Sequence, residues 1–254
     1  MGSISIICLL VLSLLLPTAK AEEISVAVAS NFTAPMKEIA SLFEQSTGHK
    51  VRLSFGSSGK FYAQIKHGAP FQIFFSADQK KPEQLERDRL IAPSSRFTYA
   101  RGRLALWSSQ KGFVKGNADR LKQLQFNKLA LANPKLAPYG VAAIEVLERL
   151  SLIEATQNKW VQGENIAQTY QFVSTGNAEL GFVALSQILK DGKLKTGSSW
   201  VIPENLYNPI KQDVVLLLRG ENSPAAQALL SFIKEPQVKQ IMTSYGYKPL
   251  AANP

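Results

Sequence analysis

The sequence contains almost no cysteine. Cys8 is the only one among 254 residues, and it lies in an apolar segment at the N-terminus. If that segment is removed, the chain has no thiol, which excludes disulfide bonds, thiolate metal sites and thiol catalysis. Cys8 also lies very early in the chain and has no small residue before it, so it does not match a lipid-attachment cysteine.

Catalytic and metal-binding motifs are also missing. The chain has two histidines, His49 and His67, and neither has a carboxylate or a second histidine at the spacing of a metal site. There is no G-x-S-x-G, no phosphate-binding P-loop and no H-E-x-x-H motif. The sequence therefore gives no support to a hydrolase, a kinase or a zinc protease.

No hydrophobic run reaches the length of a membrane span. The run from Ile4 to Leu16 is shorter than the roughly 20 residues that cross a bilayer. Pro17 ends it, and Ala19 and Ala21 stand at the positions of a small-x-small cleavage site. We interpret 1–21 as a signal peptide, although no lysine or arginine precedes the apolar run. The alternative, a buried N-terminal helix, would require amphipathic spacing, which this run lacks.

Acidic residues are fewer than basic ones. The 29 lysines and arginines against 19 acidic residues give a formal net charge of +10. The basic residues are spread along predicted helices and form no tract of five or more, so we expect no nucleic-acid partner. The basic surface is either simply solvated or attracts an anionic ligand or an acidic partner over a distance.

Four parts of the chain share one pattern. An apolar strand is followed by small hydroxyl, amide or glycine residues and then by an amphipathic helix, in 24–40, 51–65, 128–147 and 159–173. A helix that begins after such a turn has N–H groups without an intrahelical partner and about half a positive charge at that end. Four such ends that converge would form a socket for an anion without any lysine or arginine. The pattern indicates binding rather than catalysis.

Strands and helices alternate along the whole chain, which predicts an α/β fold with largely parallel sheets. The composition changes near 98–103 and 206–213. These transitions divide the chain into lobe 1, formed by 22–99 and 209–254, and lobe 2, formed by 100–208. Two crossings between lobes are what a hinge that opens and closes requires.

The turns of the four units lie in longer strings that follow one another in order over essentially the whole chain after the signal peptide. The strings are VAVASNF (26–32), SFGSSGKFYAQIKHGAP (54–70), FFSADQK (74–80), ANPKLAPYGVAAIEVL (132–147), GENIAQTYQFVSTGNAELGFV (163–183) and SYGY (244–247). They resemble those of a known family, the periplasmic molybdate-binding proteins of ATP-binding-cassette importers. The most specific part of the resemblance is S-F-x-S-S followed by G-A-P and S-A-D.

This resemblance implies a two-lobed periplasmic-binding-protein fold of type II, with two mixed, mostly parallel sheets joined by a two-strand hinge. It implies a periplasmic monomer that captures molybdate or tungstate between its lobes and delivers it to a membrane permease. The protein would be no enzyme and would need no cofactor. Molybdenum or tungsten would enter only as the oxyanion.

Carried over by position, the resemblance implies an oxyanion site with five residues. Ser30, Asn31 and Ser58 would follow the first two strands, and Tyr139 and Ile166 would contribute mainly their backbone N–H groups. The alternative for the serines is helix capping, and the alternative for Tyr139 is packing in a turn. We expect the neighbouring lysines, Lys60 and Lys135, to be solvated rather than bound to the anion, since a buried ammonium would carry a large desolvation cost. Tyr245 and Tyr247 are predicted to pack the last helix rather than to form the paired tyrosines of an iron site.

The sequence departs from the family pattern at three positions. Ala184 stands where many members have a tyrosine whose hydroxyl bonds the anion, and Tyr139 stands where many have an alanine. Gln72 replaces the aspartate of G-A-P-x-D, a change that we expect to affect local packing. Asn31 or a relocated Tyr139 hydroxyl would replace the missing donor, and we favour Asn31 because it directly follows Ser30 at a helix start.

Two other functions remain open from the sequence. One is a binding protein for another small oxyanion, such as sulfate or phosphate. The other is an exported enzyme on the same fold, with Asp78, Glu164 or His67 as acid and base groups, although these residues show no pairing in the sequence.

Overall fold

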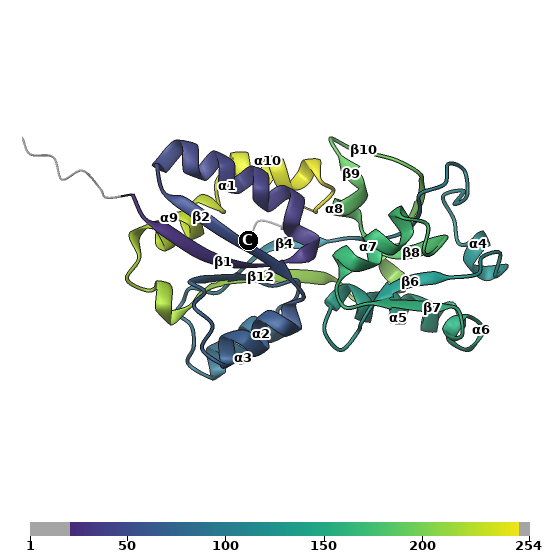
Figure 1. Ribbon diagram of the computed structural model, residues 1–254, viewed down its shortest axis with the longest axis horizontal. Helices are drawn as coiled ribbons and strands as arrows, with labels where there is room; N and C mark the ends of the chain where they lie inside the picture. The colour runs from purple at the N-terminus through teal and green to yellow at the C-terminus, as the bar shows by residue number, and fades with distance from the viewer. Residues whose placement is uncertain (1–20, 249–254) are drawn as a thin grey trace, which may run out of the picture.

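A computed structural model describes residues 21–248 of the chain. The predicted signal peptide, apart from Ala21, lies outside these residues. The described part forms two lobes that lie side by side along the long axis of the molecule (Figure 1). Within that part, no helix has the length and apolar character of a membrane span.

The first lobe is built on a five-stranded sheet with the order β2-β1-β3-β12-β4. β1 pairs in parallel with β2 and β3, whereas β12 runs antiparallel to β3 and β4. The sheet is therefore mixed. Its strands are β1 (Glu23–Ala29), β2 (Lys50–Gly56), β3 (Ile73–Phe75), β4 (Phe97–Gly102) and β12 (Ile210–Leu216).

Helices cover both faces of this sheet (Figure 1). Alternation along β1 explains why: Val26 and Val28 face one hydrophobic core, and Ala27 between them faces another. The first core includes residues of α1 (Thr33–Thr47), α9 (Pro224–Phe232) and α10 (Pro236–Ser244). The second includes residues of α2 (Ser58–Lys66) and α3 (Lys80–Arg87).

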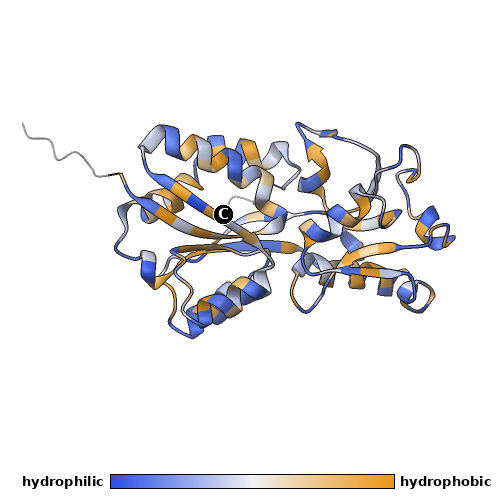
Figure 2. Ribbon diagram, in the orientation of Figure 1, coloured by the Kyte–Doolittle hydropathy of each residue, from blue (hydrophilic) through white to orange (hydrophobic). Residues whose placement is uncertain are grey.

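The second lobe is built on a five-stranded sheet with the order β11-β5-β8-β6-β7. β6 pairs in parallel with β7 and β8, and β5 runs antiparallel to β8 and β11. Figure 2 shows the apolar residues gathered on the strands and on the inner sides of the helices. The strands are β5 (Leu104–Ser108), β6 (Leu129–Ala132), β7 (Trp160–Gly163), β8 (Leu180–Ala184) and β11 (Ser198–Val201), with β9 (Leu189–Lys190) and β10 (Lys193–Leu194) as a separate two-stranded sheet.

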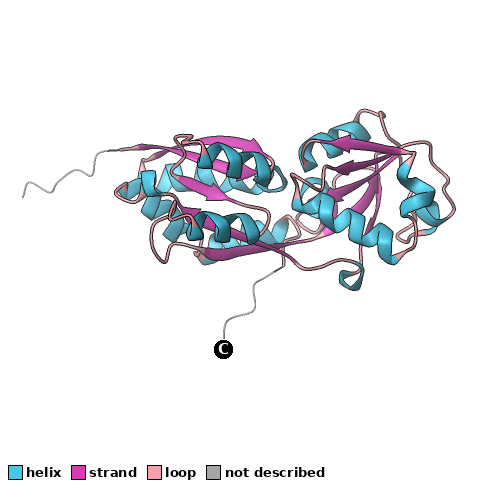
Figure 3. Cartoon of the chain, turned by 90° about the horizontal axis from the view of Figure 1, so that it is seen from below, coloured by secondary structure: helices cyan, strands magenta, loops and turns pink. Residues whose placement is uncertain are grey.

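Helices also pack on both faces of the second sheet (Figure 3). α5 (Pro138–Arg149) lies on the face that carries Leu104, Leu129 and Phe182, and α7 (Ile166–Ser174) packs against the face of Ala130 and Val183. The remaining helices are α4 (Asp119–Lys122), α6 (Ile153–Gln157) and α8 (Leu185–Ile188), with short 3-10 turns η1 (Ser30–Phe32), η2 (Glu204–Leu206) and η3 (Leu218–Gly220).

The chain crosses between the two sheets twice. Arg103 alone separates β4 from β5, and 202–209 connects β11 to β12. The first sheet therefore takes strands from both ends of the chain, and the second takes only strands from the middle. The predicted two-lobed α/β fold with mixed sheets is confirmed. The sheets are not mostly parallel as predicted, because β12 and β5 each pair antiparallel with both of their neighbours. The predicted boundaries of the lobes stay a prediction.

Candidate functional site

All five residues implied by the resemblance line one small cavity between the lobes. Its volume is about 10 Å³, which is room for a single water-sized sphere. A tetrahedral oxyanion is larger than a water molecule, so the walls must separate slightly to admit one. The lining residues are Ala29, Ser30, Asn31, Gly56, Ser57, Ser58, Ala77, Ala137, Pro138, Tyr139, Asn165 and Ile166.

The first wall of the cavity is the turn that follows β1. Ser30 and Asn31 form the start of η1 and are both buried. The Asn31 Nδ2 group donates to Gln212 Oε1 and to the Tyr247 hydroxyl, at 2.9 Å each. The Asn31 side chain is therefore fixed by residues that come from the far end of the sequence.

The second wall is the start of α2, where two adjacent serines have different roles. Ser57 is the N-cap residue, and its hydroxyl accepts from the backbone N–H of Lys60 at 3.3 Å. The Ser58 hydroxyl accepts from the backbone N–H of Ala77 at 2.9 Å. Because a hydroxyl both donates and accepts, Ser58 keeps a hydrogen to donate into the cavity.

The third wall is the start of α5. Pro138 occupies the first turn and Tyr139 follows it. Pro138 has no N–H, and the N–H of Gly140 already donates to Ala137 O at 2.9 Å, so the N–H of Tyr139 is the one at this helix start that remains available to a ligand. The Tyr139 hydroxyl accepts from Gln212 Nε2 at 3.2 Å, and burial raises the pKa of Tyr139 well above its usual value. The phenol therefore stays neutral at physiological pH.

The fourth wall is the start of α7, where Asn165 is the N-cap residue. Its Oδ1 accepts from the backbone N–H groups of Ala167 at 2.9 Å and of Gln168 at 3.1 Å. The cap therefore occupies the N–H groups of the second and third helical positions. The N–H group of Ile166, at the first position, stays available to a ligand. The Ile166 side chain is buried in the core of the second lobe, so only its backbone can serve a ligand.

Direct contacts between the lobes surround the cavity. The backbone N–H of Gly59 donates to Leu136 O at 3.0 Å, and the Ser186 hydroxyl donates to Asn31 O at 2.7 Å. Ion pairs also join the lobes, among them Lys60–Glu164 at 2.6 Å and Lys190–Glu38 at 2.7 Å. The structure therefore shows a closed arrangement of the two lobes.

Comparisons with known proteins show the family of this chain. The family model described as "Bacterial extracellular solute-binding protein" matches residues 24–248. The chain belongs to this family.

Two relatives and one solved structure show where in the family this solute-binding protein lies. It is 56% identical to the molybdate-binding protein ModA of Azotobacter vinelandii, with 92% of this chain and 93% of that protein covered. It is 48% identical to ModA of Rhodobacter capsulatus, with 94% and 92% covered. The structure of the Azotobacter vinelandii periplasmic molybdate-binding protein superposes with a TM-score of 0.87 at 39% identity, covering 89% of this chain and 99% of that one. The resemblance inferred from the sequence is confirmed.

The family assignment also confirms the prediction of a binding protein rather than an enzyme. Asp78 is paired with Lys81 at 2.6 Å, and Glu164 is paired with Lys60 across the lobes. His67 follows the C-terminal end of α2, away from the cavity at its start. In the described part of the chain, no group of three or more histidine, cysteine, aspartate or glutamate residues is arranged to hold a metal ion.

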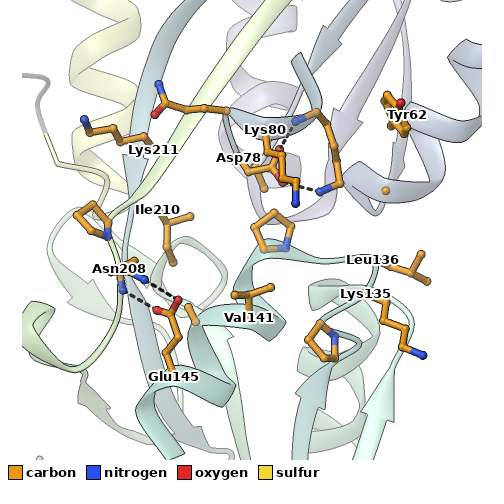
Figure 4. A pocket seen from close by; sticks show the side chains of 18 of the residues that line it. Tyr62, Asp78, Lys80, Lys135, Leu136, Val141, Glu145, Asn208, Ile210 and Lys211 are labelled. Carbon is orange, nitrogen blue, oxygen red and sulfur yellow. Dashed lines mark hydrogen bonds and ion pairs between the residues drawn. The ribbon is translucent and has the colours of Figure 1, made fainter. Parts of the chain in front are cut away.

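The lysines near the turns do not line the cavity. Lys60 is half exposed in its ion pair with Glu164, and Lys135 lines a larger neighbouring cleft. This cleft has a volume of about 910 Å³ and shares Ala77 and Pro138 with the cavity. Figure 4 shows it between the lobes, with Lys80 and Asp78 on one side and Glu145 bonded to Asn208 on the other.

Several residues in and around the site were not predicted from the sequence. Ser57 and Asn165 lie in the recognised turns and carry the capping signal of their residue types, so the signal for them was present. Gln212 was missed because the first half of β12 reads as a polar loop. Gln212 and Asp213 are nevertheless fully buried in the first lobe. Ala184, where a tyrosine donor was expected to be missing, is buried at the end of β8 and is not among the lining residues.

Proposed function

We propose that this protein captures molybdate, and also tungstate, in the periplasm and delivers it to the permease of an ATP-binding-cassette importer. The observation that carries the proposal is the convergence of four helix starts on one buried cavity between the lobes. The two relatives named as molybdate-binding proteins, at 56% and 48% identity, support this choice of anion.

The proposed ligand set is neutral. The hydroxyls of Ser30 and Ser58, the side-chain amide of Asn31, and the backbone N–H groups of Tyr139 and Ile166 would replace the water around the anion. Hydrogen bonds to a charged group contribute roughly 1.5–3 kcal/mol each. Because these donors carry no formal charge, no buried ammonium has to be desolvated.

Closure of the lobes completes the proposed mechanism. In the open form the cleft would admit the hydrated anion, and rotation about the two crossings would then bring the donors together. We assign 22–99 and 209–254 to one lobe and 100–208 to the other, with 1–21 removed as the signal peptide. The exported protein would act as a monomer, since the site is complete within one chain.

Selection against sulfate would follow from size. The bonds from molybdenum or tungsten to oxygen are longer than those from sulfur to oxygen. A rigid ring of donors placed for the larger anion therefore lies too far apart for sulfate to reach every donor. A buried donor without a partner is costly, at roughly 1–3 kcal/mol. Sulfate therefore has to bind more weakly than molybdate at the same site.

The test is a panel of oxyanions added to the purified chain 22–254, with the melting temperature as the readout. Ligand that binds only the folded state raises this temperature. We expect clear shifts with molybdate and tungstate and little shift with sulfate or phosphate at equal concentration. A larger shift with sulfate or phosphate would overturn the molybdate assignment and leave an oxyanion-binding protein of different specificity.

A further inference from the structure

A fully buried glutamine connects the candidate site to the strand that links the lobes. Gln212 lies on β12 and has 0% exposure. Its Oε1 accepts from Asn31 Nδ2 at 2.9 Å and from the Tyr99 hydroxyl at 2.9 Å. Its Nε2 donates to the Tyr139 hydroxyl at 3.2 Å. Gln212 thus touches two of the residues that line the cavity, one from each lobe.

The same cluster contains a buried polar atom that is not satisfied. Among residues 21–248, the Asn31 Oδ1 atom is buried and has no hydrogen-bond partner. Asn31 itself is 2% exposed and lines the cavity. Buried polar atoms are nearly always paired in folded proteins, and a carbonyl oxygen repels an anion. This amide orientation is therefore the wrong one for the proposed ligand.

We infer that anion binding selects the opposite orientation of two coupled amides, with Gln212 as the positioning residue for Asn31. This inference rests on the proposed function. Oxygen and nitrogen exchange places when an amide rotates by half a turn, and the surrounding hydrogen bonds decide between the two orientations. In the bound form Asn31 Nδ2 faces the anion, and Asn31 Oδ1 faces Gln212 and Tyr247.

The Tyr247 hydroxyl can follow this reversal although it has one hydrogen, which it donates to Asn31 O at 3.0 Å. It then donates to Asn31 Oδ1 instead, and Asn31 O keeps the Ser186 hydroxyl as its donor.

The other partners in the cluster can follow the reversal as well. Gln212 Nε2 then donates to Asn31 Oδ1 and to the Tyr99 hydroxyl, which in turn donates to Ser76 O, 3.2 Å away. Gln212 Oε1 accepts from the Tyr139 hydroxyl. Burial raises the pKa of both tyrosines well above the usual value, so each keeps one hydrogen to donate. The reversed network leaves neither amide with an unpaired atom.

The reversal requires a residue at 212 that both donates and accepts. An alkyl side chain would leave Asn31 Oδ1 unpaired, and a carboxylate could only accept. A carboxylate at 212 would hold Asn31 Nδ2 toward itself and turn Asn31 Oδ1 to the anion. The role of Gln212 is therefore tested by changing its hydrogen-bonding pattern while keeping its shape.

The first experiment is calorimetric titration of molybdate into Gln212→Glu between pH 5 and 9. Burial raises the pKa of a carboxyl, so the variant is ionised at the top of this range and protonated toward the bottom. A protonated carboxyl donates and accepts like the amide. We expect at least a tenfold loss of affinity at pH 9 that shrinks as the pH falls, while the wild-type affinity changes much less. Circular dichroism and melting of the ligand-free variant establish that it folds.

A double-mutant cycle with Asn31→Ala separates orientation from charge. If Gln212→Glu acts through Asn31, its effect at pH 9 falls below about threefold in the Asn31→Ala background. An equal loss in both backgrounds means simple repulsion between the carboxylate and the anion, and overturns the inference. If wild-type protein fails to bind molybdate at all, the proposed function fails instead, so the two failures are distinguishable.

Neutron diffraction from a deuterated crystal of the molybdate complex gives the direct answer for the wild-type protein. We expect two deuterium atoms on the Asn31 side-chain atom that faces the anion, and two on the Gln212 atom that faces Asn31. Deuterium on the Asn31 atom that faces Gln212 would overturn the inference. Gln212→Met, which keeps an unbranched side chain of similar length without donor or acceptor, should lose affinity at every pH, and full affinity in this variant would also contradict it.

Discussion

At the scale of single residues, the candidate site consists of neutral polar groups, several of which already make a hydrogen bond within the protein. The Ser58 hydroxyl accepts from Ala77 N, and the neighbouring Ser57 supplies the cap of α2. The serine that caps and the serine that faces the cavity are therefore different residues. This division removes the capping alternative for Ser58, whose ligand role stays a prediction.

We predict that Ser58→Ala weakens molybdate binding about 10- to 150-fold, because a hydroxyl that faces a desolvated anion contributes roughly 1.5–3 kcal/mol. Lys60→Ala should cost far less, because the Lys60–Glu164 pair is exposed at 51% and 43% of its side chains and such pairs contribute about 0–1 kcal/mol. Isothermal titration of both variants, with Lys135→Ala as a further control, measures this. A larger loss for the lysine variants would contradict the neutral-donor site.

At the scale of secondary-structure elements, closure brings the start of α2 against the segment before α5. Gly59 donates to Leu136 O at 3.0 Å, and a Cβ atom at this position would lie 3.0 Å from both the Cα and the O of Leu136. Both of these are backbone atoms, which yield less readily than the end of a side chain. Glycine at this position therefore permits the close approach of the two lobes.

Gly59→Ala is expected to weaken molybdate binding by about tenfold, which corresponds to roughly 1.4 kcal/mol, because the added methyl group opposes closure. The ligand-free protein should melt close to the wild-type temperature, since alanine is favoured over glycine in a helix. Gln64→Ala, an exposed substitution on the same helix, is the control. Unchanged affinity in Gly59→Ala would mean that the approach of α2 to Leu136 is not part of the bound state.

A second contact between elements joins α1 to β9. The Lys190 ammonium, together with the Tyr245 hydroxyl, holds the pKa of Glu38 below its usual value against the opposing effect of burial, and Glu38 raises the pKa of Lys190. A carboxyl with a lowered pKa stabilises the closed form above its usual pKa, about 4.3, and loses this effect as the pH falls through the lowered value. The lysine loses its contribution only as the pH rises through its own raised pKa.

Between about pH 5 and 10 the Glu38–Lys190 pair should therefore contribute a constant amount, and this amount is small because both side chains are partly exposed. We expect wild-type protein to bind molybdate slightly more tightly than Glu38→Gln at pH 7, with a difference that begins to shrink below about pH 4.3 and vanishes only below the lowered pKa of Glu38. Any protonation of the ligand changes the affinity of both proteins equally at a given pH, so it does not affect the difference between them. Glu44→Gln, whose pair with Lys50 lies within one lobe, should show no such difference. A difference in affinity between Glu38→Gln and wild type that grows as the pH falls below about 4 would contradict this prediction.

At the scale of the whole molecule, the two lobes are joined by two crossings and by contacts around the cavity. Contacts of this kind can form only when the lobes meet, whereas each lobe has hydrophobic cores of its own. The lobes can therefore separate as rigid units without unfolding. The basic surface, with a formal charge of +10 for the whole chain, would attract an anion toward the open cleft.

Small-angle X-ray scattering of the chain 22–254 should show a smaller radius of gyration with saturating molybdate than without ligand. The expected cause is hinge closure, so sulfate at the same concentration should leave the scattering unchanged. Gly59→Ala should need more molybdate to reach the compact form. Identical scattering curves with and without molybdate would exclude closure on binding.

The fold and the candidate site were predictable from the sequence to different degrees. The four turns could be predicted because small residues after an apolar strand form a local sequence pattern. All four turns meet at the cavity. The burial of Gln212 could not be predicted, because a polar residue in a buried strand departs from the apolar pattern by which such strands are recognised. Its partners, Asn31, Tyr99 and Tyr139, are supplied by segments distant in the sequence, so only the folded chain reveals them.

The proposed anion site is tested most directly by a crystal structure of the mature protein with tungstate, with the tungsten atom located by its anomalous scattering. We expect one strong peak in the cavity. Its oxygens should lie within hydrogen-bonding distance of the side chains of Ser30, Asn31 and Ser58 and of the backbone N–H groups of Tyr139 and Ile166. No lysine should touch the anion. A peak in the neighbouring cleft beside Lys80, Lys135 or Lys211, with none in the cavity, would show that the anion does not bind at the four helix starts.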